Sequence, residues 1–423
     1  MKEGDMVRIL TKDRQFEGVL MPSVHTESVV LKLSSGYNVG ILKSSVKKTV
    51  QLGKRISSLT KPKKHIHVSV KKTVSILHTG GTIASKVDYE TGAVGAHFSP
   101  DDLIEMFPEL EALVNLNSRF LSNMWSEDMR FSHYNTMAKE IKKEVDKGVD
   151  GVIITHGTDT MHFTAAALSF ILEDLSIPVI LVGAQRSSDR GSSDAAMNLV
   201  CAIEFMTQTD FAEVAICMHK GMSDDMCWIL PGLKCRKLHS SRRNAFQPVN
   251  AQPYAEIDYL TRKVHIVTPH FRKKDPNKKL ILQLFKDVRV GLVKTHPHMF
   301  ADVFTTYTGY DGLVIEGSGL GHVPINKIDS DTSEHQKIFA QLQNLAKKMP
   351  VVMASQTLFG RVNMNVYSTG RVLQEMGVLG NFSDMMPETT YIKLAWLLSN
   401  YPKKVKEMIG QNLRGELSER SLI

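Results

Sequence analysis

Three short apolar runs in this chain of 423 residues are each followed at once by a polar loop that contains glycine. The runs cover residues 74–77, 151–154 and 179–182, and the last two lead into segments with helical spacing of apolar residues, 161–171 and 198–205. Alternation of strand, loop and helix is typical of an α/β fold with doubly wound parallel sheets. Because ligands of such sheets bind beyond the carboxyl ends of the strands, we expect the three loops to form one rim that carries the chemistry.

The chain is long enough to form several compact units. Residues 1–52 alternate apolar and polar positions in short runs, which predicts a small all-β barrel domain. Residues 53–72 are rich in Lys and Ser without a sustained period, so a linker is predicted there. We expect an N-terminal α/β catalytic domain over residues 73–285 and a smaller C-terminal α/β domain over residues 286–423.

The composition is that of an ordinary soluble globular protein, with 42% hydrophobic and 23% charged residues. No apolar stretch approaches the roughly 18 residues of a membrane span and no leader pattern begins the chain, so a cytoplasmic location is expected. The formal net charge of +8 would favour a polyanion such as RNA, although a solvated basic surface is the simpler explanation. The spacing of the four cysteines matches no common zinc site and predicts free structural thiols.

Two of the rim loops carry threonines next to glycine. In the first, two adjacent glycines allow a sharp turn that presents Thr82 at the end of a strand. In the second, His156-Gly-Thr-Asp-Thr160, Thr158 and Asp159 would lie at a helix N-terminus, where exposed N–H groups favour a developing oxyanion. Separately, the first pattern is commonly a tight turn and the second a helix cap. A cap does not explain two threonine-bearing loops at strand ends of one sheet.

Together, TGGTIAS (residues 79–85) and HGTDTM (residues 156–161) resemble the two signature motifs of the L-asparaginase and glutaminase family. The resemblance spans roughly residues 73–400. It implies a pair of asparaginase-like α/β domains that hydrolyse the side-chain amide of a small amino acid and release ammonia.

Position by position, the resemblance implies two threonine centres. Thr82 matches the nucleophilic threonine of the first motif, and Tyr89 matches the tyrosine that activates it. Thr158 matches the second threonine, and Lys237 matches the buried lysine that acts as its base. A threonine hydroxyl is a weak nucleophile that needs a neighbouring base, and a lysine serves if desolvation lowers its pKa. Composition alone would instead favour an exposed lysine in a basic loop.

The resemblance also implies residues that bind the amino-acid group of the substrate. Asp159 matches the carboxylate that holds the α-ammonium, and Ser126 and Glu127 fall where the family binds the α-carboxylate and the α-amine. In the family, an acidic residue of the neighbouring protomer often completes the first centre, but the corresponding stretch here, residues 355–367, has no carboxylate. We therefore expect the first centre to be built differently.

Four further features of the sequence indicate a narrower family. The β domain, the stretches 87–94 and 360–367 and the tail 412–421 resemble the D subunits of archaeal-type glutamyl-tRNA(Gln) amidotransferases. The resemblance implies a homodimer through the asparaginase-like domains, within a hetero-oligomer that includes the amidotransferase E subunit. That partner would hold Glu-tRNA(Gln), activate its glutamate with ATP and magnesium, and accept the ammonia released here from glutamine or asparagine. No cofactor or metal is expected on this chain.

Two alternatives stay open at this stage. The chain also fits a free-standing L-asparaginase with an unrelated N-terminal appendage, or a non-catalytic RNA-binding scaffold that its basic charge would suit. Partner-independent turnover would favour the first alternative. Full activity after removal of the Thr158 hydroxyl would favour the second.

Overall fold

The computed structural model describes residues 5–21, 27–33, 38–53, 71–81, 83, 86–87, 94–95, 109–188 and 193–421. Among these residues, no helix is both long enough and apolar enough to cross a membrane. The four cysteines are buried and free, as predicted from their spacing.

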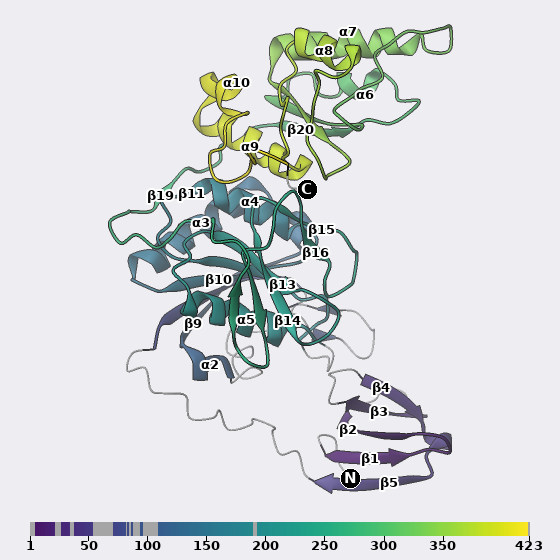
Figure 1. Ribbon diagram of the computed structural model, residues 1–423, viewed down its shortest axis with the longest axis vertical. Coiled ribbons are helices and arrows are strands. Elements are labelled where there is room, and N and C mark those ends of the chain that lie inside the picture. The colour runs from purple at the N-terminus through teal and green to yellow at the C-terminus, as the bar shows by residue number, and fades with distance from the viewer. Residues whose placement is uncertain are drawn as a thin grey trace.

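The N-terminal domain is a small antiparallel sheet, in agreement with the predicted all-β unit (Figure 1). Its order is β4-β3-β2-β1-β5. The strands are β1 (Met6–Leu10), β2 (Gln15–Met21), β3 (Ser28–Leu33), β4 (Asn38–Leu42) and β5 (Lys48–Gly53). Alternate side chains of β1, Val7 and Ile9, pack with Leu31 and Ile41 to form a core of its own.

The second unit is built on an eight-stranded sheet of order β18-β17-β14-β13-β12-β10-β6-β9. Its strands are β6 (Thr73–Gly80), β9 (Asn115–Met124), β10 (Gly151–Thr155), β12 (Val179–Val182), β13 (Val214–His219), β14 (Met226–Pro231), β17 (Ala255–Asp258) and β18 (Val264–Ile266). Five neighbouring strands of this sheet are parallel, as the strand-helix alternation predicts: β9, β6, β10, β12 and β13. The central strands are buried on both faces, which is why they read as continuous apolar runs.

The other three strands make the sheet mixed, which the sequence pattern did not predict. β14 runs antiparallel to β13, β17 to β14 and β18 to β17. Only residues 220–225 separate β13 from β14. A connection this short allows a hairpin, whereas a parallel crossover needs a dozen or more residues.

Helices cover both faces of this sheet. α3 (Phe131–Asp146) and α4 (Met161–Ile171) bury their apolar sides against one face, while α2 (Glu109–Leu113) and α5 (Ala195–Gln208) bury theirs against the other. The pleat of β10 divides its side chains accordingly, since Val152 and Ile154 join the first cluster and Ile153 joins the second.

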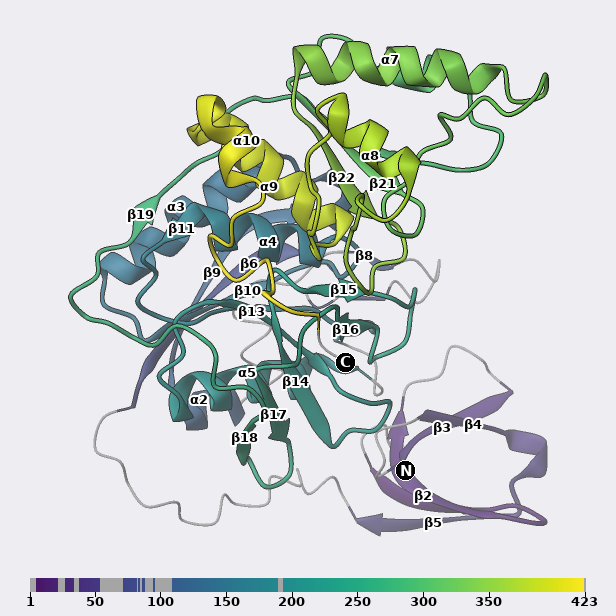
Figure 2. The ribbon, with the colours of Figure 1, turned by 45° about the horizontal axis from the view of Figure 1, so that its top comes forward.

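The C-terminal unit is a parallel three-stranded sheet of order β20-β21-β22, within the region predicted to form a smaller α/β domain. Its elements are β20 (Val290–Lys294), α6 (Asp302–Thr305), β21 (Gly312–Gly317), α7 (Glu334–Lys348), β22 (Val351–Ser355) and α8 (Ser368–Glu375). The following helix, α9 (Pro387–Asn400), packs against α4 of the second unit and against β21 of this one. Figure 2 shows α9 lying between the second unit and the C-terminal unit. One apolar cluster contains buried side chains of α9 and of both units.

Two further short pieces matter for the site. The two-stranded sheet β15 (Cys235–Lys237) and β16 (Phe246–Pro248) lies beside the larger sheet. After α9, the short helices η4 (Pro402–Lys404) and α10 (Val405–Met408) lead into the C-terminal tail, residues 412–421. In Figure 2 this yellow tail descends from α10 to end beside β16.

Candidate active site

The centre of the site is a contact between Thr158, Asp159 and Lys237, three residues that sequence analysis had selected. The Nζ atom of Lys237 lies 2.7 Å from Thr158 Oγ1 and 2.7 Å from Asp159 Oδ1. The Lys237 side chain is 8% exposed, whereas that of Asp159 is 68% exposed. A buried amine therefore adjoins a buried hydroxyl on one side and a carboxylate open to solvent on the other.

Glycine at two loop tips permits the approach of the first two rim loops. Gly81, the first residue after β6, has a φ of 83°, and a Cβ atom added to it would collide with the backbone of Gly157. A Cβ atom on Gly157 would in turn lie 2.9 Å from Cβ of Ser126. Three loops, after β6, β9 and β10, thus meet with backbones almost in contact, next to Thr158.

Ser126 and Glu127 lie on this rim, in the short helix η3 (Ser126–Asp128) that follows β9. Ser126 is buried, and its carbonyl oxygen accepts a 2.6 Å hydrogen bond from the Thr160 hydroxyl. Its own hydroxyl lies 3.4 Å from the Glu127 carboxylate, which is exposed. The η3 segment is therefore fixed to the loop that carries Thr158 and Asp159.

Two buried histidines brace the strands beneath the loops. His156 donates from Nδ1 to the Gly157 carbonyl at 2.7 Å, and its Nε2 lies 2.8 Å from the Thr164 hydroxyl. His78 bridges the hydroxyls of Thr155 and Ser118, at 3.0 and 2.8 Å. Burial lowers the pKa of His78 and of His156 to about 4. Both rings are therefore neutral near pH 7 and serve as hydrogen-bonding supports.

Three charged or titratable side chains around the strand that carries Lys237 were not predicted from the sequence: Arg236, Glu388 and His162. Arg236 pairs with Glu388 of α9 at 2.7 Å, and burial raises the pKa of Glu388, an effect that Arg236 partly offsets. His162 of α4 is buried, and its Nδ1 has no hydrogen-bond partner among the residues that the structure describes. Burial lowers its pKa to about 3, and the Arg236 cation adds to this. The only signal in the sequence was the position of Arg236 next to Lys237.

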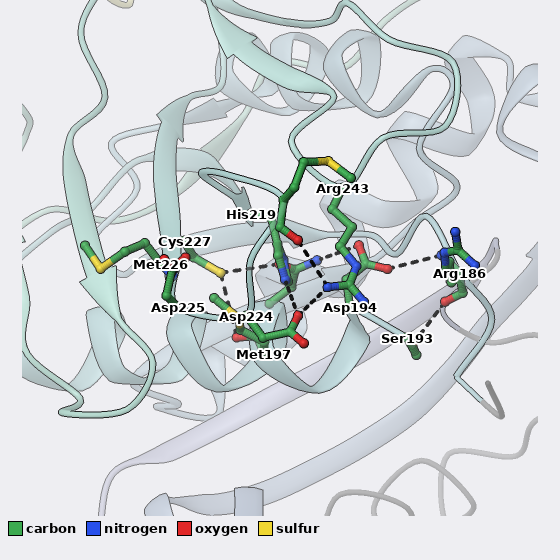
Figure 3. Close-up of polar contacts among 12 residues, drawn as sticks. Arg186, Ser193, Asp194, Met197, His219, Asp224, Asp225, Met226, Cys227 and Arg243 are labelled. Carbon is green, nitrogen blue, oxygen red and sulfur yellow. Dashed lines mark hydrogen bonds and ion pairs between the residues drawn. The ribbon is translucent and has the colours of Figure 1, made fainter. Parts of the chain in front are cut away.

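Figure 3 shows a second polar cluster, which includes Asp194, His219, Asp224 and Arg243. Asp194, the N-cap residue of α5, accepts hydrogen bonds from the backbone of Gln185 and Arg186 in the loop after β12. Nearby, Asp224 accepts a 2.5 Å hydrogen bond from the buried Arg243, in the loop between β15 and β16. The cluster joins the third rim loop and the β15–β16 loop to the same part of the sheet. Asp224 thus serves as the partner of a buried arginine.

Two other predicted site residues, Thr82 and Tyr89, lie outside the described residues. Their roles stay predictions. The residues on either side of position 82, Gly81 and Ile83, are buried.

Comparison with known protein families matches three models to the chain. The model described as "Asparaginase, N-terminal" matches residues 73–270, and "Glutaminase/Asparaginase C-terminal domain" matches residues 289–409. A third, "GatD N-terminal domain", matches residues 1–52.

Curated relatives resemble the chain over almost its whole length. The D subunit of the glutamyl-tRNA(Gln) amidotransferase of Methanococcus maripaludis is 41% identical over 99% of both chains. The corresponding protein of Archaeoglobus fulgidus is 44% identical over 98% of this chain and 95% of its own. That of Pyrococcus furiosus is 41% identical over 98% of this chain and 94% of its own.

Solved structures agree with these matches. The thermostable L-asparaginase of Thermococcus kodakarensis superposes with a TM-score of 0.71 at 28% identity, covering 82% of this chain and 100% of its own. L-asparaginase I of Vibrio cholerae gives 0.70 at 28% identity with the same coverage. Given two asparaginase domains, the N-terminal β domain and full-length relatives at 40% identity or more, the chain belongs to the family of glutamyl-tRNA(Gln) amidotransferase D subunits.

Proposed function

We propose that this chain hydrolyses the side-chain amide of glutamine or asparagine and that a partner uses the ammonia to convert Glu-tRNA(Gln) to Gln-tRNA(Gln). The observation that carries the proposal is the contact of the Lys237 amine with the Thr158 hydroxyl, on a rim shared with Asp159 and Ser126. A hydroxyl nucleophile with a base at hydrogen-bonding distance is the arrangement that covalent amide hydrolysis requires.

In the proposed reaction, the amine of Lys237 acts as the base and accepts the hydroxyl proton as a threonine oxygen attacks the carboxamide carbon. Thr158 is the hydroxyl paired with this base, and Thr82 supplies the other centre, which Tyr89 activates. The carbon–nitrogen bond breaks, and the proton passes to the leaving nitrogen, so ammonia departs and an acyl ester remains. Water then attacks the ester, which yields the free acid and restores the hydroxyl. A positioned base of this kind contributes on the order of 10²- to 10⁴-fold to the rate.

The exposed carboxylates suit the amino-acid end of the substrate. Asp159 projects its carboxylate to solvent beside Lys237, where it can accept an α-ammonium group. Glu127 is exposed on the same rim, next to the buried Ser126, and we assign this pair to the α-amine and the α-carboxylate. Charge-assisted hydrogen bonds of this type are strong enough to orient a small zwitterion.

We further propose that the partner is the amidotransferase E subunit, which holds Glu-tRNA(Gln) and uses ATP and magnesium to activate its glutamate. In this scheme the chain itself holds no cofactor or metal. Two copies pair through the asparaginase-like domains, and with two copies of the partner they form a cytoplasmic heterotetramer. Delivery within a complex suits the chemistry, since ammonia released into water is lost or protonated.

The Thr158→Ala variant tests the function in the complete complex. We expect it to lose glutamine-driven amidation of Glu-tRNA(Gln), because no hydroxyl faces the Lys237 amine, yet to amidate normally when ammonium is supplied. The unmodified complex, assayed with each nitrogen donor, is the control. Full glutamine-driven activity in the variant would support a non-catalytic scaffold instead. High asparagine turnover by the isolated chain, unaffected by partner or tRNA, would support a free-standing asparaginase.

A further inference from the structure

We infer that the C-terminal tail is a positioning element for Lys237, and that Ser418, Asp384 and Glu388 fix the strand β15 from which this lysine reaches Thr158. The inference rests on the proposed function of Lys237. It assigns a part in the reaction to residues far from the rim loops in sequence, on α9, on the segment before it and on the tail.

Lys237 lies in a short strand that needs contacts from other parts of the chain to hold it in place. β15 has three residues and pairs with β16 in a sheet of two strands, apart from the eight-stranded sheet that fixes Thr158. An isolated two-stranded pair is marginally stable by itself. The position of Lys237 relative to Thr158 therefore depends on what holds β15 from the side.

The side chains of residues 234–237 alternate between two environments, as in an extended strand. Cys235 is buried in the apolar cluster, and Lys237 reaches Thr158. Lys234 and Arg236 instead pair with carboxylates of the C-terminal part of the chain, Asp384 and Glu388. Every second side chain of this segment thus forms an ion pair with the C-terminal part of the chain.

The tail completes the site that holds Lys234. The Nζ atom of Lys234 lies 2.7 Å from Asp384 Oδ2 and 2.6 Å from the Ser418 hydroxyl. The other carboxylate oxygen of Asp384 accepts the backbone N–H of Ser418 at 3.1 Å. The Lys234 and Asp384 side chains are only 6% and 1% exposed, so water cannot readily replace a lost partner.

The next contacts along the strand come from α9. Arg236 pairs with Glu388 at 2.7 Å, and the hydroxyl of Thr389 donates to the Leu233 carbonyl at 2.8 Å. Glu388 and Thr389 are neighbours in the first turn of α9. Together with Lys234, they attach three of the five residues from Leu233 to Lys237 to the C-terminal part of the chain.

The tail is itself held in place. Glu416 and Lys393 of α9 form an ion pair at 2.6 Å with both side chains fully buried. Further on, Arg361 donates to the Ser418 carbonyl at 3.0 Å and to the Ser421 hydroxyl at 3.2 Å. Residues 416–421 thus run along a fixed path, and Ser418 is the point on it that contacts the segment leading into β15.

Two variants of the full chain test the inference, with a third as the matched control. Ser418→Ala removes the hydroxyl from Lys234, and a chain ending at Leu417 removes Ser418 but keeps the Glu416–Lys393 pair. Ser421→Ala, the control, removes a tail hydroxyl that contacts Arg361 and not Lys234. Hydrolysis of glutamine and of asparagine gives kcat and KM, and hydrogen exchange monitored by mass spectrometry follows the peptide that spans residues 233–237.

We expect both test variants to lower kcat roughly tenfold or more, since a misplacement of about 1 Å costs up to 10²-fold. KM should stay within about twofold, because Asp159 and Ser126 are untouched. Exchange in residues 233–237 should become faster in both, while Ser421→Ala behaves as the unmodified chain and Ser418→Thr restores kcat. If the shortened chain does not fold, the comparison of Ser418→Ala with Ser418→Thr tests the inference without it.

Unchanged exchange across residues 233–237 in Ser418→Ala would overturn the inference, whatever happens to kcat. Unchanged kcat with faster exchange would also overturn it, since the tail would then hold the strand without serving the reaction. If the unmodified protein hydrolyses neither amide even in the complete complex, the proposed function fails instead. The exchange measurement then still reports whether the tail fixes β15.

Discussion

Lys237 has two partners that differ in their exposure to water. Thr158 is buried, so its hydroxyl has few competing hydrogen-bond partners, whereas the Asp159 carboxylate is largely solvated. Interactions in a water-excluded position are worth more than the same interactions at a surface. The contact with Thr158 is therefore the one on which we expect the chemistry to depend.

Two substitutions of Lys237 should show whether the reaction needs only its positive charge or also its ability to accept a proton. We expect Lys237→Met to lower kcat by 10²-fold or more, because the methionine side chain fills the space but accepts no proton. Lys237→Arg should not restore activity, since a guanidinium stays protonated at any working pH. Steady-state hydrolysis of glutamine and asparagine measures both, with circular dichroism to check the fold. Wild-type turnover by the arginine variant would contradict the role of base.

The buried histidines should make stability depend on pH. The folded chain lowers the pKa of His78 and of His156 from the ordinary 6.5 to about 4, so between these values the unfolded chain binds more protons. The stabilisation is complete above about pH 6.5 and is lost as the pH falls toward 4. We expect the free energy of unfolding to fall over this window by a few kcal/mol for each histidine.

Denaturant titrations at pH 7.5 and pH 4.5 measure this loss. In His78→Gln, which replaces the ring with a side chain that does not titrate, the difference between the two pH values should shrink. His270 is exposed in the loop that follows β18, and a matched His270→Gln variant serves as the control. An equal pH response in all three chains would show that other groups cause it.

At the scale of elements, α9 connects three parts of the molecule. It packs between α4 and β21, its first turn holds Arg236, and Lys393 near its middle holds the tail through Glu416. Lys393 also donates to the carbonyls of Ile409 and Gln411, and the Glu416 carboxylate accepts the N–H groups of Leu413 and Arg414. The ion pair is thus fully hydrogen-bonded, as a buried pair must be.

Removal of one charge from this pair should be costly. We expect Glu416→Gln to lower the free energy of unfolding by about 3–5 kcal/mol, because Lys393 would stay buried without a counter-charge. As a control, Asp146→Asn breaks the Lys142 pair of α3, whose side chains are 58% and 38% exposed, and should cost about 1 kcal/mol or less. Urea titrations compare the two. Equal small losses would show that the buried lysine finds another partner.

Sequence patterns predicted the elements that local rules govern. Apolar runs located β10 and β12, helical spacing located α4 and α5, and the loops after β6 and β10 were recognised by their motifs. The patterns could not predict the antiparallel edge of the sheet, which depends on the pairing of β14 with β17 across 23 intervening residues, 232–254. Likewise, Lys237 could be selected by its motif, but nothing local indicates that Glu388 faces Arg236 or that Ser418 faces Lys234.

At the scale of the whole molecule, the N-terminal domain has a core distinct from the others. Within the described part of the chain, the cluster around Val7, Ile9, Leu31 and Ile41 draws its packed neighbours from residues 16–46. The other apolar clusters draw on residues 74 and beyond. Units with separate cores are expected to fold separately.

A chain that begins at Lys71 should therefore fold and hydrolyse glutamine or asparagine with kcat close to that of the full chain. Its thermal midpoint for the asparaginase-like part should change by only a few degrees. Calorimetry and steady-state hydrolysis measure both quantities on the isolated chains. If the shortened chain aggregates or loses kcat while the full chain is active, the N-terminal domain contributes to the fold of the catalytic unit.

The contact between Gly81 and Gly157 also limits how this enzyme can evolve. Every single-base change in a glycine codon that gives another amino acid adds at least one carbon, and here that carbon would meet the backbone of the facing loop or Ser126. Neither glycine can therefore be replaced unless the facing loop changes as well, so a tolerated substitution would need a second mutation at the same time. Lineages that shift between amide substrates are thus expected to vary the side chains around the rim while both glycine codons stay unchanged.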